Sequence, residues 1–221
     1  EYDSQSSVNT SLQSWISWFC TLPGNEFYVE VPEEFIEDDF NLTGLSSVVP
    51  YYNEALEMIL DIETEEKDSQ QGQEDPDEEK DLTIEPYAAM LYGLIHQRYL
   101  LTRHGQRIMA QRFAEEQFGT CPRVFCDNCP VIPCGRYDQV GKESVRLYCP
   151  SCMDLYHSPN DIHVGVDGAH FGTTYAHLMF QAFSELIPID HTRIYEPRIF
   201  GFRINERSPS GPRMQWLRMR P

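Results

Sequence analysis

"CPRVFCDNCPVIPC" (residues 121–134) and "CPSC" (residues 149–152) together contain six of the seven cysteines of this 221-residue chain. Zinc binds four thiolates tetrahedrally, and two closely spaced cysteine pairs form such a site when a β-hairpin brings them together. The stretch therefore predicts a zinc ribbon, in which a closed shell of four sulfurs serves structure rather than catalysis. An iron–sulfur cluster and a redox-active cysteine pair are less favoured interpretations of the same pattern.

The spacing identifies one cysteine pair and leaves the other open. Cys149 and Cys152 are separated by two residues and form the second pair. For the first pair, Cys126 and Cys129 have the same two-residue gap, whereas Cys121 and Cys126 are separated by four residues. Spacing alone favours Cys126 and Cys129.

The composition indicates an acidic protein that can bury a core. The chain has 17 basic and 35 acidic residues, and its net charge of -18 argues against general attraction to nucleic-acid phosphates. Local crowding of the cysteines fits a metal site in a reducing compartment, and we expect the cytoplasm and nucleus. We expect neither a secretory signal nor a transmembrane helix, because no run of roughly 18 apolar residues occurs.

The N-terminal part predicts an all-helical domain over residues 14–118, preceded by disordered residues 1–13. Ser14 is a suitable cap for a first short helix, and Pro32 suits the first turn of another. Apolar residues recur at helical spacing in three further segments, which are residues 50–60, a strong helix beginning after Pro86, and residues 105–117.

Residues 61–81 interrupt these helices with a strongly acidic segment. Ten acidic residues follow Asp61, with only two lysines among Gln, Ser, Gly and Pro. Such a composition cannot bury apolar surface, so we predict an exposed loop. It is either a solvated linker or a binding loop for polyamines, other cations or basic protein substrates.

After Gly119 the sequence predicts a small β domain over residues 119–180 and an extended tail over residues 181–221. Short strands such as "SVRLYC" alternate inward and outward residues, so the fold class is α+β. So small a domain cannot cover all of its apolar side chains, and the remainder would suit self-association. The apolar side chains in question are Val124, Phe125, Val131, Ile132, Val145 and Leu147.

The tail contains the segment "PRIFGFRIN" (residues 197–205). In an extended strand, Phe200 and Phe202 project to the same side, and Gly201 between them offers no obstruction. A strand pair could add to a partner's sheet while both rings enter a shallow pocket.

Eight motifs occur together and in order, over roughly residues 14–205: "SWISWFC", "GNEF", "FNLTGL", "MLYGLIH", "CPRVFC", "LYCPSCMDLY", "DGAHFGTT" and "PRIFGF". With them the chain resembles the regulatory beta subunits of casein kinase II. The resemblance implies a helical domain, a zinc-binding dimerisation domain and a tail that docks the catalytic alpha subunit. The implied assembly is a tetramer of two beta and two alpha chains.

The resemblance also assigns residues. It implies that the zinc ligands are Cys121, Cys126, Cys149 and Cys152, against the preference from spacing. Cys129 and Cys134 are then unligated thiols at the surface or in a loop. Phe200, Gly201 and Phe202 match the hairpin that docks the alpha subunit. The acidic segment matches a region linked to polyamines and basic substrates, here Glu63, Glu65, Glu66, Asp75, Asp77, Glu78 and Glu79.

The sequence contains no catalytic signature. We find no glycine-rich phosphate loop, no His-Arg-Asp or Asp-Phe-Gly, and neither His-Glu-x-x-His nor Gly-x-Ser-x-Gly. We therefore expect a kinase regulator that is not itself an enzyme. The alternative is a zinc-ribbon protein that binds nucleic acid or serves as a transcription-associated scaffold, using Arg123, Arg136, Arg146 and the arginine-rich tail.

Overall fold

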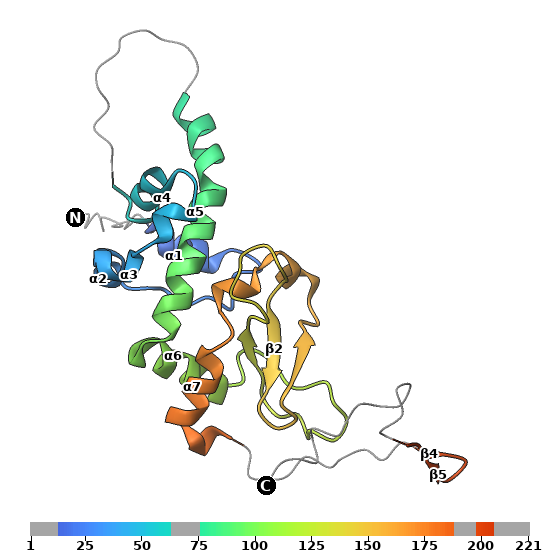
Figure 1. Cartoon of the computed structure of the whole chain (residues 1–221). Coiled ribbons are helices and arrows are strands. Elements are labelled where there is room, and N and C mark those ends of the chain that lie inside the picture. Colours follow the sequence, from blue (N-terminus) through green and yellow to red (C-terminus); the bar gives the residue numbers. More distant parts are fainter. Residues whose placement is uncertain (1–12, 63–75, 188–197, 206–221) are drawn as a thin grey trace, which may run out of the picture. The chain divides into compact units, whose positions relative to one another are not determined.

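The computed structural model describes residues 13–62, 76–187 and 198–205, with the backbone alone for residues 76–82. The chain divides into two compact units, residues 1–95 and residues 96–221 (Figure 1). Helices occur in both units, and two small antiparallel sheets lie in the second. The predicted α+β class is confirmed. The division falls within a long helix, at Ile95, whereas the sequence led us to expect a boundary near residue 119.

The described part of the first unit is built from short helices beside one long helix. Ser14 caps the first of them, as predicted, because its Oγ accepts a hydrogen bond from the Ser17 amide at 3.3 Å. The second begins directly after Pro32, also as predicted. The elements are α1 (Trp15–Thr21), α2 (Glu33–Ile36), α3 (Asp39–Leu42), the 3₁₀ helix η1 (Leu45–Ser47), α4 (Tyr52–Ile59) and the first part of α5 (Pro76–Leu100).

Tyr92 of α5 organises the core of this unit. Its ring lies 5.7 Å from that of Trp15 and 5.1 Å from that of Phe19, both edge-on, which fixes α1 against α5. Its hydroxyl donates to the Val29 carbonyl at 2.8 Å and accepts from the Val31 amide at 3.1 Å. One buried hydroxyl thus satisfies the backbone of a segment that is neither helix nor strand.

The prediction that the whole acidic segment is a loop is wrong for the C-terminal part of that segment. We expected residues 61–81 to be loop and the helix to start after Pro86, but α5 begins at Pro76 and continues through Pro86. Proline is favoured at the first helical position, where its missing N–H costs nothing. Acidic residues directly after it stabilise the positive end of the helix dipole. Residues 63–75 lie outside the described part of the chain.

The second unit contains a three-stranded antiparallel sheet, in which β1 (Ile132–Cys134), β2 (Arg146–Cys149) and β3 (Asp154–His157) lie in that order. Ile132 pairs with Tyr148 across β1 and β2, and Tyr148 pairs with Leu155 across β2 and β3. The helices of the second unit are the end of α5, α6 (Arg103–Ala114), α7 (Tyr175–Ala182) and the 3₁₀ helices η2 (Asp161–Gly165), η3 (Gly168–His170) and η4 (Ser184–Leu186). The second, two-stranded sheet consists of β4 (Arg198–Ile199) and β5 (Phe202–Arg203).

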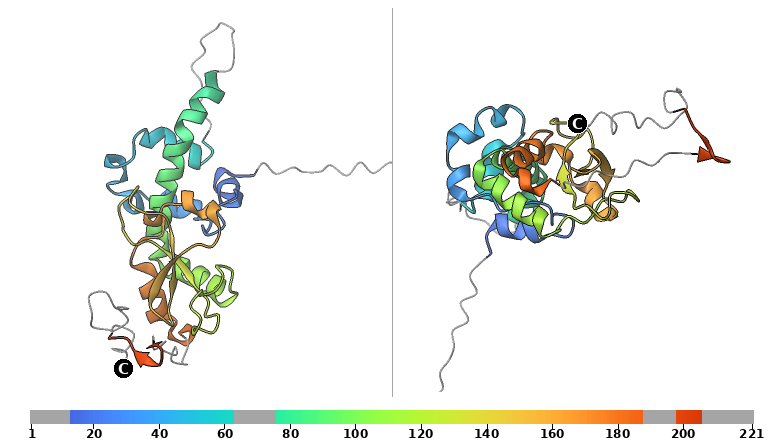
Figure 2. Two further views of the ribbon diagram at one scale, coloured as in Figure 1. Left: turned by 90° about the vertical axis from the view of Figure 1, so that its right-hand side faces the viewer. Right: turned by 90° about the horizontal axis from the view of Figure 1, so that it is seen from below.

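Helix α7 contacts one face of the three-stranded sheet. It packs against β1 and α6 (Figures 1 and 2). The Tyr175 hydroxyl donates to the Pro133 carbonyl, and the Phe180 ring lies 6.2 Å from that of Tyr148. We expected that the small domain could not cover all of its apolar side chains, and four of the six in question are buried, namely Val131, Ile132, Val145 and Leu147.

Val124, one of these six side chains, is 84% exposed, in line with the expectation that some would stay uncovered. Other exposed apolar side chains of the second unit include Met153, Leu155, Ile162, Val164 and Leu178. None of the helices in the described residues has the length and apolar character that a membrane span requires.

Replacing Tyr92 by Phe tests the organisation of the first unit. The Val31 amide loses its acceptor inside the core, so we expect a loss of about 1–3 kcal/mol in unfolding free energy. Urea unfolding followed by tryptophan fluorescence measures it, since Trp15 contacts the Tyr92 ring. Tyr51→Phe is the control, because Tyr51 is 57% exposed. An equal unfolding free energy for the Tyr92→Phe and Tyr51→Phe variants would contradict this account of the core.

Candidate metal centre

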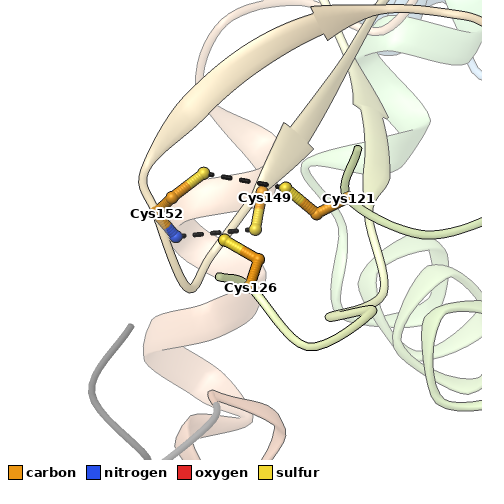
Figure 3. Close-up of side chains that lie close together, drawn as sticks. All are labelled: Cys121, Cys126, Cys149 and Cys152. Carbon is orange, nitrogen blue, oxygen red and sulfur yellow. Dashed lines mark hydrogen bonds between the residues drawn. The ribbon is translucent and has the colours of Figure 1, made fainter. Parts of the chain in front are cut away.

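Four buried cysteines converge beyond one end of the three-stranded sheet, where its central strand β2 ends. The sulfurs of Cys121, Cys126, Cys149 and Cys152 all lie within 4.8 Å of one another. Figure 3 shows them approaching from two directions, one pair from the loop before β1 and the other from the end of β2 and the turn after it. The Sγ atoms of Cys121 and Cys152 are 3.9 Å apart.

Local backbone geometry forms each pair. In the second pair, the Met153 amide donates to the Cys149 carbonyl at 2.8 Å, and the Cys152 amide points at Cys149 Sγ at 3.5 Å. Met153 has a positive φ of 55°, which closes the turn. In the first pair, the Cys126 amide donates to the Arg123 carbonyl at 3.0 Å, so the four intervening residues curl back.

This arrangement fits a tetrahedral metal ion bound by sulfur. Zn–S bonds of about 2.3 Å in a tetrahedron place sulfurs about 3.8 Å apart, close to the separation of Cys121 and Cys152. Burial raises the pKa of the Cys126 thiol to about 12, while a hydrogen bond from Cys149 lowers the pKa of Cys152 to about 5. A bound cation takes the place of thiol protons, so four clustered sulfurs of this kind can hold a metal ion.

Cys129 and Cys134 lie outside the cluster, and of the expected surface or loop positions only the loop is found, for Cys129, since both thiols are buried. Each is only 5% exposed. Cys129 sits in a loop, where its thiol donates to the Pro130 carbonyl at 3.4 Å and also contacts Cys149. Cys134 is part of β1, and burial raises the pKa of its thiol to about 12. Cys134 therefore remains a neutral, packed side chain.

A polar network that the cysteine spacing does not predict surrounds Cys152. Tyr156 Oη lies 3.1 Å from Cys152 Sγ. Arg123, which lies between Cys121 and Cys126 in the sequence, is also part of this network. Its Nε lies 2.9 Å from Tyr156 Oη, and its Nη2 lies 2.8 Å from Asp154 Oδ2. Only the alternation of Asp154 and Tyr156 on a strand directly after the cysteines could have pointed to it.

The tail residues form a hairpin, as the resemblance implied, although Phe200 and Gly201 lie in its turn and not in an extended strand. Ile199 of β4 pairs with Phe202 of β5, and Phe200 and Gly201 make the two-residue turn between them. Both turn residues have positive φ angles, 48° and 85°, the signature of a type I′ turn. Phe200 is 97% exposed and Phe202 80% exposed, so both rings are presented to solvent.

The side chains of the acidic residues expected to bind cations are not among those that the structure describes. Glu63, Glu65, Glu66 and Asp75 lie outside the described residues, and Asp77, Glu78 and Glu79 belong to the first turn of α5, where only the backbone is described.

The family model of the casein kinase II regulatory subunit matches residues 14–203, which include both cysteine pairs and the hairpin. The chain belongs to this family. The casein kinase II subunit beta-2 of Schizosaccharomyces pombe is 50% identical over 93% of this chain and 79% of its own length. Casein kinase II subunit beta of Dictyostelium discoideum is 44% identical over 92% of this chain and 73% of its own length. Casein kinase II subunit beta of Saccharomyces cerevisiae is 43% identical over 94% of this chain and 84% of its own length.

Membership in the casein kinase II regulatory subunit family confirms the resemblance seen in the sequence. It also confirms that the chain is regulatory rather than catalytic.

Serine substitutions distinguish the two candidate ligand sets. We expect Cys121→Ser to lose bound zinc, because it removes one of the four clustered sulfurs. Cys129→Ser should keep one zinc per chain, since Cys129 lies outside that group. Elemental analysis of the purified full chain measures both. The reverse result, with zinc retained in Cys121→Ser and lost in Cys129→Ser, would show that spacing was the better guide.

Proposed function

We propose that this chain is the non-catalytic regulatory subunit of casein kinase II. In this proposal it forms a zinc-dependent homodimer that binds, stabilises and steers two catalytic alpha subunits in a heterotetramer. The observation that carries the proposal is the convergence of four buried cysteine sulfurs in a chain of this family. A closed shell of four protein ligands leaves no position for substrate, which suits a structural rather than a catalytic metal.

Exposed apolar side chains beside the cysteines support the proposed link between zinc binding and dimerisation. Val124 lies between the ligands Cys121 and Cys126, and Met153 directly follows Cys152. Both side chains are exposed, at 84% and 40%. Their positions depend on the two cysteine turns, so metal binding would order the surface that a second copy of the chain contacts.

Docking of the alpha subunit is assigned to the hairpin. A two-stranded hairpin has little stability of its own, yet this one carries Ile199, Phe200 and Phe202 exposed at 58%, 97% and 80%. Exposed aromatic side chains at the tip of a strand pair suit insertion into an apolar pocket of a partner.

We assign the acidic residues a role in binding cations. Glu63, Glu65, Glu66, Asp75, Asp77, Glu78 and Glu79 would attract polyamines or basic protein substrates through charge, an effect that salt screens. The cytoplasm and nucleus remain the compartments that we propose.

The nucleic-acid alternative is weaker on the described contacts. Arg123 is paired with Asp154 at 2.8 Å, and Arg146 is paired with Glu143. Carboxylates already partner these two guanidinium groups, so they are poorly placed to neutralise phosphates. Titration with DNA at two salt concentrations, beside titration with the kinase subunit, separates the alternatives.

Removing the metal should dissociate the dimer. Without a cation the four sulfurs no longer hold both cysteine turns, and the surface carrying Val124 and Met153 loses its order. Sedimentation at neutral pH, with and without a strong chelator, measures the mass. A mass that stays dimeric after elemental analysis shows that zinc has gone would refute the dependence. Val124→Asp, with its zinc intact, should also sediment as a monomer.

Phe202→Ala should weaken binding of the catalytic alpha subunit at least ten-fold, which corresponds to about 1.4 kcal/mol. The variant removes an exposed ring from the hairpin and leaves the sulfur cluster untouched. Phe40→Ala is the matched control, because Phe40 is 83% exposed but belongs to α3. Calorimetry with the isolated alpha subunit gives both affinities. Equal affinities for the two variants would remove the hairpin from the interface.

A further inference from the structure

The contacts of Tyr156 determine the direction of its hydrogen bonds. Arg123 Nε lies 2.9 Å from Tyr156 Oη, and a guanidinium group can only donate. Tyr156 Oη accepts this bond, so its single hydrogen is left for Cys152 Sγ, 3.1 Å away. A metal-bound thiolate has no proton and can only accept, which is the role that this geometry gives to Cys152.

Arg123 is itself held in place. Its Nη2 donates to Asp154 Oδ2 at 2.8 Å while its Nε donates to Tyr156, so one guanidinium spans alternate residues of β3. Residues two apart point to the same face of a strand, which explains the spacing. The Arg123 side chain is 23% exposed, and its charge is therefore kept near the sulfurs with reduced screening.

We propose that Tyr156 and Arg123 are positioning residues for the metal centre. Tyr156 donates a hydrogen bond to the Cys152 thiolate, and Arg123 orients that hydroxyl and offsets part of the negative charge of four thiolates. This inference rests on the proposed zinc site. Side chains that hydrogen-bond to a metal ligand fix its orientation, and their loss typically lowers metal affinity ten- to hundred-fold.

The network also joins the two halves of the site. Arg123 lies between the first two ligands, Cys121 and Cys126, whereas Tyr156 lies on the strand after the last ligand, Cys152. Separation of the two cysteine pairs would break the bond from Arg123 to Tyr156. The pair therefore opposes the movement that releases the metal, and its loss should accelerate release.

Tyr156→Phe tests the proposal, because it removes the hydroxyl and keeps the ring. In the full chain we expect zinc affinity, measured by competition with a metallochromic chelator, to fall ten- to hundred-fold. Arg123→Gln should change the affinity in the same direction. Tyr137→Phe is the matched control, since Tyr137 belongs to the same unit and is 47% exposed, and its affinity should equal that of the unmodified chain.

Cobalt(II) in place of zinc separates the hydrogen bond from a general loss of packing. A thiolate that loses a hydrogen bond is a stronger electron donor, so its charge-transfer band to cobalt moves to longer wavelength. We expect this shift in Tyr156→Phe and not in Tyr137→Phe. If Tyr156→Phe does not fold, Arg123→Lys, which keeps the charge but loses the fork, should show the lower affinity.

The outcomes distinguish this inference from the zinc site on which it rests. An unmodified chain that binds no zinc, or a Cys152→Ser chain that keeps it, would remove the metal centre itself. Zinc bound by the unmodified chain and lost from Cys152→Ser, with affinity and cobalt band unchanged in Tyr156→Phe, would overturn only the role of Tyr156 and Arg123.

Discussion

The convergence of four sulfurs is the constraint on which the second unit depends. Two of them precede β1 and the other two lie at the end of β2 and just after it, so the antiparallel pairing of Ile132 with Tyr148 brings them together. Strands of three or four residues are hardly stable alone. The sheet therefore closes the distance between the thiols, and a bound cation would in turn hold the sheet.

Sequence spacing alone could predict one half of this site. The two-residue gap of Cys149 and Cys152 identified the second pair, but the same gap at Cys126 and Cys129 did not identify the first. Asp127 and Asn128, between those cysteines, both have left-handed backbones, with φ angles of 47° and 57°. Residue counting does not show this local turn, and only the resemblance to a family pointed to Cys121.

The other misjudged elements share a cause, since each was inferred from a local pattern. The acidic run suggested loop, but Pro76 and the acids after it suit a helix start, as Pro32 did where the prediction succeeded. Which apolar residues of the small domain would stay exposed could not be predicted, because no short-range signal shows how its helices and strands pack together. The helical segments themselves were predictable, because their apolar periodicity is local.

The hairpin combines a strained turn with exposed aromatic side chains. Phe200 occupies a left-handed conformation that glycine or asparagine usually fills, at a cost of roughly 1–2 kcal/mol for a residue with a Cβ. Its ring gains nothing in return within the chain, because it is 97% exposed. Complete burial of an apolar side chain of this size contributes roughly 1.5–3 kcal/mol, and two rings together exceed the cost of the turn. In our proposal the turn thus holds both rings ready for the alpha subunit, and its strain is offset only in the complex.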